Sequence, residues 1–100
     1  MRRTRNAKII ATLGPASSSR EVIKQLFDAG ADVFRINMSH GTQEDHRERV
    51  DLIRDIEKQV GRPIAILLDI QGPKLRVGRF IDDAIDLLEG ERFRLDVSDE

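Results

Sequence analysis

Three short apolar segments alternate with two amphipathic ones between residues 8 and 69, and this order constrains the fold more than any other feature of the chain. The apolar segments cover residues 8–13, 32–37 and 64–69, a length typical of buried strands. Each connection is long enough for a helix, so the pattern predicts parallel neighbouring strands joined by right-handed crossovers. The sequence therefore predicts an α/β fold, either a doubly wound sheet or part of a (β/α)₈ barrel.

Helix signals mark both connections. The serines at 17–19 are candidate N-caps of the first helix, and we interpret them as caps and not as nucleophiles, because no histidine lies where it could activate them. Gly30 is expected to end this helix. Thr42 is expected to cap a longer helix that ends at Gly61. Its inner stripe consists of Val50, Ile53, Ile56 and Val60.

The strand and helix pattern changes after residue 75. Residues 76–80 and 92–97 alternate between apolar and polar side chains, which predicts short antiparallel strands. A finished barrel needs at least about 200 residues, so a chain of 100 residues holds less than half of one. We expect residues 1–74 to form the beginning of a barrel and residues 75–100 to begin a β-rich module.

Charge and composition exclude several classes of protein. Seventeen Lys and Arg against eighteen Asp and Glu give a net charge of -1, so neither nucleic acid nor an acidic membrane is an expected partner. The chain has no cysteine, which excludes disulfide and thiol chemistry. It also has no apolar run long enough to cross a membrane, so a soluble cytoplasmic protein is expected.

Polar side chains follow the expected strands, where ligands of α/β sheets usually bind. Arg35, Asn37 and Ser39 share one face of the second strand. A charge in an apolar strand needs a partner, so Arg35 is expected to bind an anionic ligand or to form a structural ion pair with Asp69. Asn37, Ser39 and Asp69 could hold a hard cation or could serve only as hydrogen-bonding groups of the loops.

The neighbouring side chains leave further alternatives open. His40 can contact a phosphate or point into solvent. A tight turn before Lys74 directs Lys74 and Arg76 either at a polyphosphate or into solvent. We expect His46 to lie at the surface, Met38 to pack in the interior, and the charged residues of 44–58 to form a solvated helix face.

Three segments resemble the amino-terminal part of pyruvate kinase: KIIATLGPAS at 8–17, AGADVFRINMSHG at 29–41 and LDIQGPKLR at 68–76. The resemblance implies a (β/α)₈ barrel interrupted after its third strand by a β-rich lid domain, which would begin near Leu75. It also implies phosphoryl transfer between phosphoenolpyruvate and ADP, giving pyruvate and ATP in glycolysis, by a cytoplasmic enzyme that forms a homotetramer. The competing hypothesis is a non-catalytic module that binds phosphate or nucleotide at the same strand ends.

The resemblance assigns roles to individual positions. It implies that Arg35 contacts the phosphate of phosphoenolpyruvate. It implies contacts with the phosphates of the nucleotide by Asn37, Met38, Ser39, His40 and Arg76. The monovalent-cation positions of potassium-dependent members match Asn37, Ser39, Asp69 and the carbonyl of Ile70.

One departure from the common family pattern concerns the cation. The family usually has Asp-Thr-Lys-Gly-Pro-Glu where residues 69–74 read Asp-Ile-Gln-Gly-Pro-Lys. The ammonium of Lys74 places a fixed positive charge near the cation position, and together with Ile70 and Gln71 it resembles the potassium-independent branch of the family. The resemblance implies that Mg²⁺ or Mn²⁺ is required and that K⁺ is unnecessary. The resemblance implies that the divalent-metal ligands and the catalytic lysine come from later barrel strands, so we expect residues 1–100 alone to be inactive.

Overall fold

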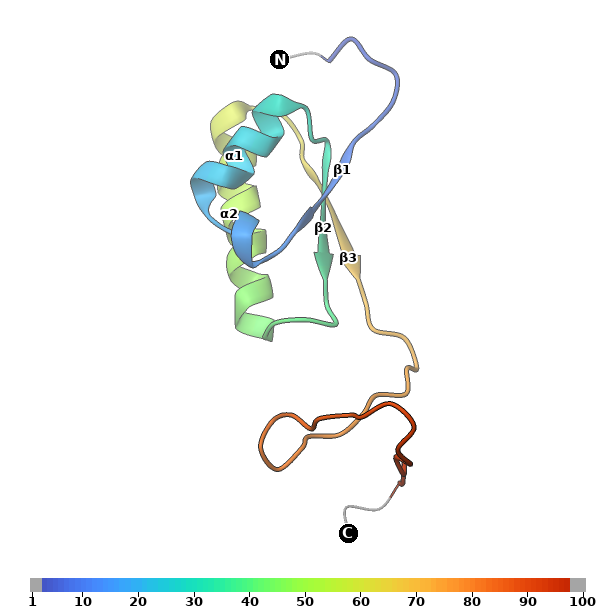
Figure 1. Cartoon of the computed structure of the whole chain (residues 1–100). Coiled ribbons are helices and arrows are strands. Elements are labelled where there is room, and N and C mark those ends of the chain that lie inside the picture. The colour runs from blue at the N-terminus through green and yellow to red at the C-terminus, as the bar shows by residue number, and fades with distance from the viewer. Residues whose placement is uncertain (1–2, 98–100) are drawn as a thin grey trace.

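The computed structural model describes residues 3–97 as a three-stranded sheet with two helices, followed by an extended segment (Figure 1). The strands are β1 (Ile10–Leu13), β2 (Val33–Asn37) and β3 (Ala65–Asp69). The helices are α1 (Arg20–Ala29) and α2 (Gln43–Val60), and a short 3₁₀ turn, η1 (Pro15–Ser17), precedes α1. No helix among residues 3–97 combines the length and the apolar character that a membrane span requires.

The strands pair in chain order, β1-β2-β3, and both pairs are parallel, which confirms the predicted strand–helix–strand pattern. Thr12 lies opposite Arg35, and Asn37 lies opposite Asp69. Each strand begins one or two residues later than predicted. At β1 the reason is local, because the main-chain N–H of Ile9 donates to the carboxylate of Asp32 and not to a strand.

Both helices cover the same face of the sheet (Figure 1). The core lies between them and the strands, where Phe34 and Ile36 of β2 are fully buried against Ile23 of α1 and Ile53 of α2. Burying a side chain of this size contributes about 1.5 to 3 kcal/mol, so these four side chains account for much of the driving force that holds the helices on the sheet.

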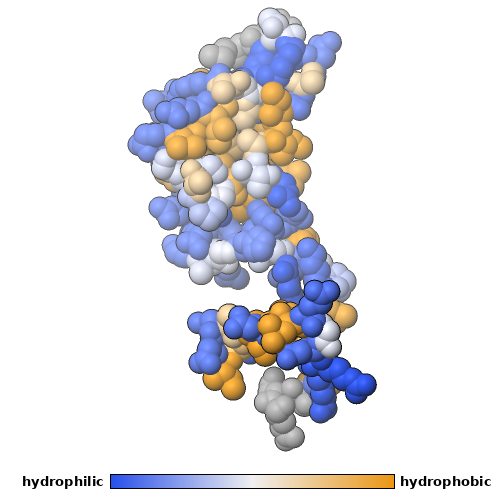
Figure 2. Space-filling model, in the orientation of Figure 1, coloured by the Kyte–Doolittle hydropathy of each residue, from blue (hydrophilic) through white to orange (hydrophobic). Residues whose placement is uncertain are grey.

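The opposite face of the sheet is open among the described residues. Ile10 and Leu67 remain 54% and 39% exposed there, and hydrophobic surface is visible over the strands (Figure 2). Arg35 and Asn37 point to this same side, since they alternate with the buried Phe34 and Ile36. Polar groups on β2 are therefore only half-buried, and not enclosed by apolar layers.

The helix ends follow the predicted signals. Ser19 caps α1 by accepting a hydrogen bond from the N–H of Val22 at 3.3 Å. Thr42 and Asp45 form a reciprocal capping box at the start of α2. At its other end Gly61 adopts a left-handed conformation with φ of 62°.

The prediction of short antiparallel strands after residue 75 is wrong for the part of the chain that the structure describes. Residues 75–97 contain no strand, and Leu75, Ile81 and Val97 are fully exposed. The ring centres of Phe80 and Phe93 approach to 6.5 Å, but every residue of 75–97 except Phe80 is exposed. An isolated two-stranded ribbon is marginal in water, so alternation alone does not produce strands without a layer to pack on.

Candidate functional site

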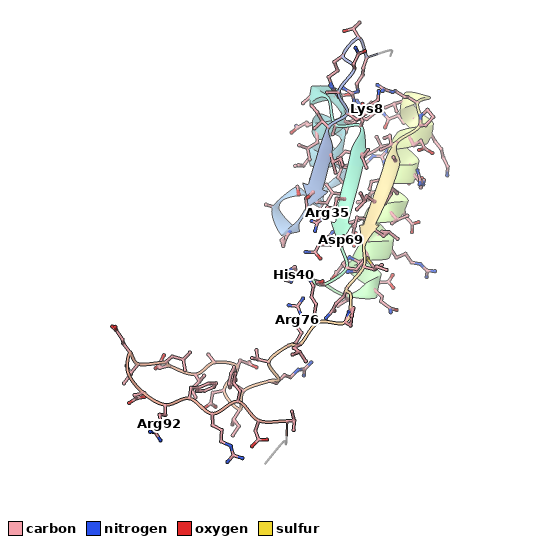
Figure 3. All side chains as sticks on the ribbon, turned by 90° about the vertical axis from the view of Figure 1, so that its right-hand side faces the viewer. Lys8, Arg35, His40, Asp69, Arg76 and Arg92 are labelled. Carbon is pink, nitrogen blue, oxygen red and sulfur yellow. The ribbon has the colours of Figure 1, made fainter. Side chains whose placement is uncertain are left out.

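The candidate site lies at the carboxyl ends of the three strands. Figure 3 shows Arg35, Asp69, His40 and Arg76 following one another along this end of the sheet and into the segment after β3. Parallel pairing explains the grouping, because Thr12, Arg35 and Asp69 occupy adjacent strands on the open face. The structure therefore brings Thr12, Arg35 and Asp69 into contact from three strands.

Arg35 forms an ion pair with Asp69. Its Nε donates to Oδ2 of Asp69 at 3.1 Å and its Nη2 donates to the same oxygen, while Nη1 lies 3.5 Å from Oγ1 of Thr12. The side chains are 31% and 45% exposed, respectively. The structural ion pair considered from the sequence is thus present, and the guanidinium is oriented by Asp69 while part of it stays accessible to a ligand.

The segment 37–40 forms a tight hydrogen-bonded loop. The side-chain Oδ1 of Asn37 accepts from the N–H of Ser39 at 3.0 Å, and the N–H of His40 lies 3.4 Å from the carbonyl of Asn37. The N–H of Met38 donates to the carbonyl of Asp69 at 2.9 Å, and its side chain packs against the core as predicted. This loop is thereby anchored to the end of β3.

The candidate cation ligands are oxygen atoms of unlike kinds. Among residues 3–97 no group of three or more His, Cys, Asp or Glu side chains could hold a metal ion. A cation at this end of the sheet would depend on the amide of Asn37, the hydroxyl of Ser39, the carboxylate of Asp69 and the carbonyl of Ile70. In the structure one carboxylate oxygen of Asp69 is already engaged by Arg35.

The two candidate cations after β3 are exposed. The N–H of Lys74 donates to the carbonyl of Gly72 at 2.8 Å, which closes the expected turn. The side chains of Lys74, Arg76 and His40 lie at the surface, so both alternatives considered for them, phosphate contact and solvation, agree with their position.

The prediction that His46 lies at the surface is wrong, because it is only 5% exposed. Its Nδ1 is buried and has no hydrogen-bond partner among residues 3–97. The helical spacing indicates that position 46 is buried, because it lies one turn before Val50 and two turns before Ile53, on the inner stripe of α2. The preference of histidine for the surface is weaker than this periodicity.

The first turns of α2 also contact the loop after β1. Nε of Arg49 donates to Oγ of Ser18 at 2.9 Å, and that hydroxyl donates to the carbonyl of Gly14 at 2.6 Å. Next to Gly41, the N–H of Thr42, followed by its hydroxyl, holds the pKa of Asp45 below its usual value. Residues 44–58 are therefore more than a solvated face.

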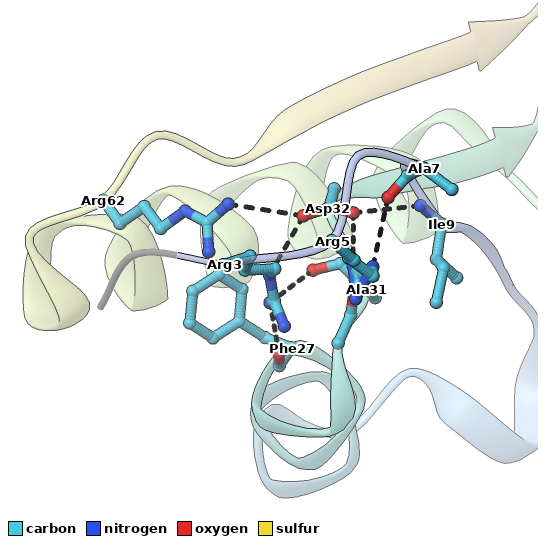
Figure 4. A network of polar contacts seen from close by, with 9 residues as sticks. Arg3, Arg5, Ala7, Ile9, Phe27, Ala31, Asp32 and Arg62 are labelled. Carbon is cyan, nitrogen blue, oxygen red and sulfur yellow. Dashed lines mark hydrogen bonds and ion pairs between the residues drawn. The ribbon is translucent and has the colours of Figure 1, made fainter.

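A second polar cluster, which the sequence did not reveal, lies at the opposite end of the sheet (Figure 4). Asp32 is its only carboxylate, and it lies 2.9 Å from Nε of Arg3, 2.5 Å from Nη2 of Arg5 and 3.3 Å from Nη2 of Arg62. The N–H of Ile9, and next the Arg5 guanidinium, lower the pKa of Asp32. These contacts join the start of the chain to β2 and to the end of α2.

The cation of Arg3 also lies 4.9 Å from the ring centre of Phe27, which is buried in α1. The guanidinium donates to the carbonyls of Phe27 and Ala31 at 2.5 Å and 2.9 Å. No local pattern predicts this arrangement, because its members are separated by more than twenty residues. The cluster lies at the end of the sheet where the strands begin, away from the candidate site.

Comparisons with known proteins agree on one family. Residues 4–100 match the family model described as "Pyruvate kinase, barrel domain". A pyruvate kinase of Methylorubrum extorquens is 58% identical over 96 residues, which cover 96% of this chain and 20% of that protein. Pyruvate kinase 2 of Synechocystis is 47% identical over 93 residues, covering 91% of this chain and 16% of the relative.

Pyruvate kinase II of Salmonella typhimurium is 45% identical over 97 residues, which cover 97% of this chain and 20% of that protein. The chain thus spans 16% to 20% of the length of these relatives. The agreement extends over the sheet, both helices and the candidate site. The chain belongs to the pyruvate kinase family.

Proposed function

We propose that this protein acts as a pyruvate kinase, transferring a phosphoryl group between phosphoenolpyruvate and ADP. The observation that carries the proposal is the Arg35–Asp69 pair on the open face of the sheet, at the end where ligands of parallel α/β sheets bind. Membership of the family supports it. We also propose that the enzyme is cytoplasmic and forms a homotetramer.

The fold proposal is that residues 1–74 form the first three strands of a (β/α)₈ barrel. A doubly wound sheet carries helices on both faces, whereas α1 and α2 cover one face only. The exposed Ile10 and Leu67 would then point into the barrel interior, where further strands cover them. We propose that residues 75–100 begin the inserted lid domain, whose remaining strands would give their apolar side chains a layer to pack on.

In this proposal Arg35 binds the transferring phosphoryl group. Phosphoryl transfer depends on positioning and on neutralising charge, and a planar guanidinium contacts phosphate oxygens in a fixed geometry. Asp69 would orient Arg35, while Asn37, Met38, Ser39, His40 and Arg76 would contact the phosphates of the nucleotide. Mg²⁺ or Mn²⁺ would neutralise further charge when bound, held by residues outside residues 1–100.

A further part of the proposal is that the enzyme needs no monovalent cation. Asn37, Ser39, Asp69 and Ile70 occupy the positions assigned to that ion. The ammonium of Lys74 follows them after a single turn and supplies a fixed positive charge in the same region. Its exposure leaves it free to approach a bound substrate.

The test is a hybrid enzyme in which residues 4–100 of this chain replace the matching segment of the Methylorubrum extorquens pyruvate kinase. We expect the hybrid to form pyruvate from phosphoenolpyruvate and ADP. Arg35→Lys keeps the positive charge but loses the planar guanidinium with its several N–H donors. It should lower kcat/KM for phosphoenolpyruvate at least about tenfold, equivalent to about 1.4 kcal/mol. Arg47→Ala, at an exposed position of α2, is the matched control and should leave kcat/KM unchanged.

Two results would contradict the proposal. A folded hybrid without turnover that still binds ADP would favour the non-catalytic module. Equal turnover by the parental and Arg35→Lys hybrids would remove Arg35 from the substrate site.

A further inference from the structure

His46 is the one polar or charged residue among residues 3–97 that is buried as a whole. Its ring lies with the apolar side chains of the inner stripe of α2, yet no group in the described part of the chain forms a hydrogen bond with Nδ1. An unpaired polar atom in a protein interior costs free energy that a phenylalanine or leucine at the same position would avoid. The presence of histidine there is unfavourable for stability alone.

The ring of His46 lies directly against the loop of the candidate site. A side chain on Gly41 would place its Cβ 3.4 Å from Cε1 of His46 and 3.3 Å from Oδ2 of Asp45. Gly41 has a φ of 78°, and it immediately follows His40. Position 41 of the loop therefore lies beside the edge of the imidazole that carries Cε1, the carbon bonded to Nδ1.

The same end of α2 contacts the loop after β1. Arg49, three residues after His46, is joined through Ser18 to the carbonyl of Gly14. Residues on one side of the first two turns of α2 thus contact the loops that follow both β1 and β2. This arrangement gives the helix a means to hold the two loops in a fixed relation at the candidate site.

We propose that His46 is a positioning residue for segment 37–41, and that its Nδ1 forms a hydrogen bond with the backbone of this segment when nucleotide phosphate is bound. The inference rests on the proposed function, because that function supplies the phosphate. It assigns to His46 no contact with substrate. The unpaired atom lowers the stability of the free protein and favours the ligand-bound position of the loop.

The experiment uses the active hybrid enzyme and three variants. His46→Phe keeps an aromatic ring without polar atoms, His46→Gln restores a hydrogen-bonding side chain, and Arg47→Ala is the exposed control on the same helix. For His46→Phe we expect an equal or higher thermal midpoint and a KM for ADP raised at least about fivefold, with the KM for phosphoenolpyruvate within about twofold. His46→Gln should recover most of the affinity for ADP.

A purely structural role gives different results. If His46→Phe lowers the thermal midpoint and raises both KM values alike, His46 only fills space and the inference is wrong. It is equally wrong if His46→Phe leaves the KM for ADP unchanged. An inactive parental hybrid would overturn the proposed function, and this inference with it, whereas an active hybrid with an unaffected His46→Phe variant overturns the inference alone.

Discussion

The two ends of α2 offer a matched pair of glycines for testing how tightly the candidate site is built. Gly41 and Gly61 both have positive φ angles, 78° and 62°. Around Gly61 an added Cβ would meet nothing within 4 Å, whereas at Gly41 it would meet Asp45 and His46. Replacing each glycine by alanine therefore separates the cost of the backbone conformation from the cost of crowding.

The expected magnitudes follow from this geometry. The left-handed conformation costs a residue with a Cβ about 1 to 2 kcal/mol, and this cost applies to Gly61→Ala and Gly41→Ala alike. Gly41→Ala adds a contact of 3.3 Å with Oδ2 of Asp45, shorter than an ordinary van der Waals separation, and one of 3.4 Å with His46, at the lower limit of that range. The Asp45 carboxylate is itself held by the N–H of Thr42. We expect Gly41→Ala to be the more destabilising variant and to displace the main chain next to His40.

The assay compares thermal midpoints and the KM for ADP in the hybrid enzyme. Gly61→Ala should lower the thermal midpoint without changing the KM for ADP, since Gly61 follows the last residue of α2, far from the carboxyl ends of the strands where the candidate site lies. Gly41→Ala should lower the midpoint further and raise the KM. Equal midpoints for the two variants, together with an unchanged KM, would show that the loop accommodates a Cβ freely and would refute the reasoning.

Three further predictions concern charge and completeness. The lowered pKa of Asp32 stabilises the folded protein above the carboxyl's unfolded pKa of about 3.9, and this contribution disappears as the pH falls through the lower folded pKa. Urea titrations should therefore show Asp32→Asn less stable than the parent at pH 7, with the difference shrinking below about pH 4; a constant difference would contradict this. Lys74→Glu should make turnover depend on K⁺, tested by replacing K⁺ with a bulky organic cation; strong activation of the parental enzyme by K⁺ would instead refute the role of Lys74. A polypeptide of residues 1–100 should form no pyruvate above background, because the divalent-metal ligands and the catalytic lysine are expected on later barrel strands; turnover by the purified polypeptide would contradict the prediction.

The elements and their order could be predicted from the sequence because each signal is local. Ser19, Thr42 and Gly61 act on atoms a few residues away, so their roles follow from the neighbouring sequence. The parallel pairing follows from the length of the connections. The prediction of strands in residues 75–97 failed because a strand needs a paired strand and a packing layer, and an alternating sequence specifies neither.

The cluster around Asp32 could not be predicted from the sequence for a different reason. Arg3 lies before Asp32 and Arg62 lies 30 residues after it, and nothing near residue 32 in the sequence indicates them. His46 was within reach of a local rule, since helical periodicity places it on the inner stripe. Its polar character led to the wrong prediction, and the same conflict between residue type and position indicates a role beyond packing.

The surroundings of Arg35 could be predicted from the sequence only in part. The sequence offered Arg35 two partners, Asp69 or a ligand, and the pair with Asp69 is present. With side chains 31% and 45% exposed, such a pair contributes only about 0 to 1 kcal/mol to stability. Stability alone therefore does not explain an arginine between the buried Phe34 and Ile36. Both hydrogen bonds go to one oxygen of Asp69, which orients the guanidinium but leaves it able to bind a stronger anion. In the proposed function, the ion pair with Asp69 and the contact with substrate are two states of the same side chain.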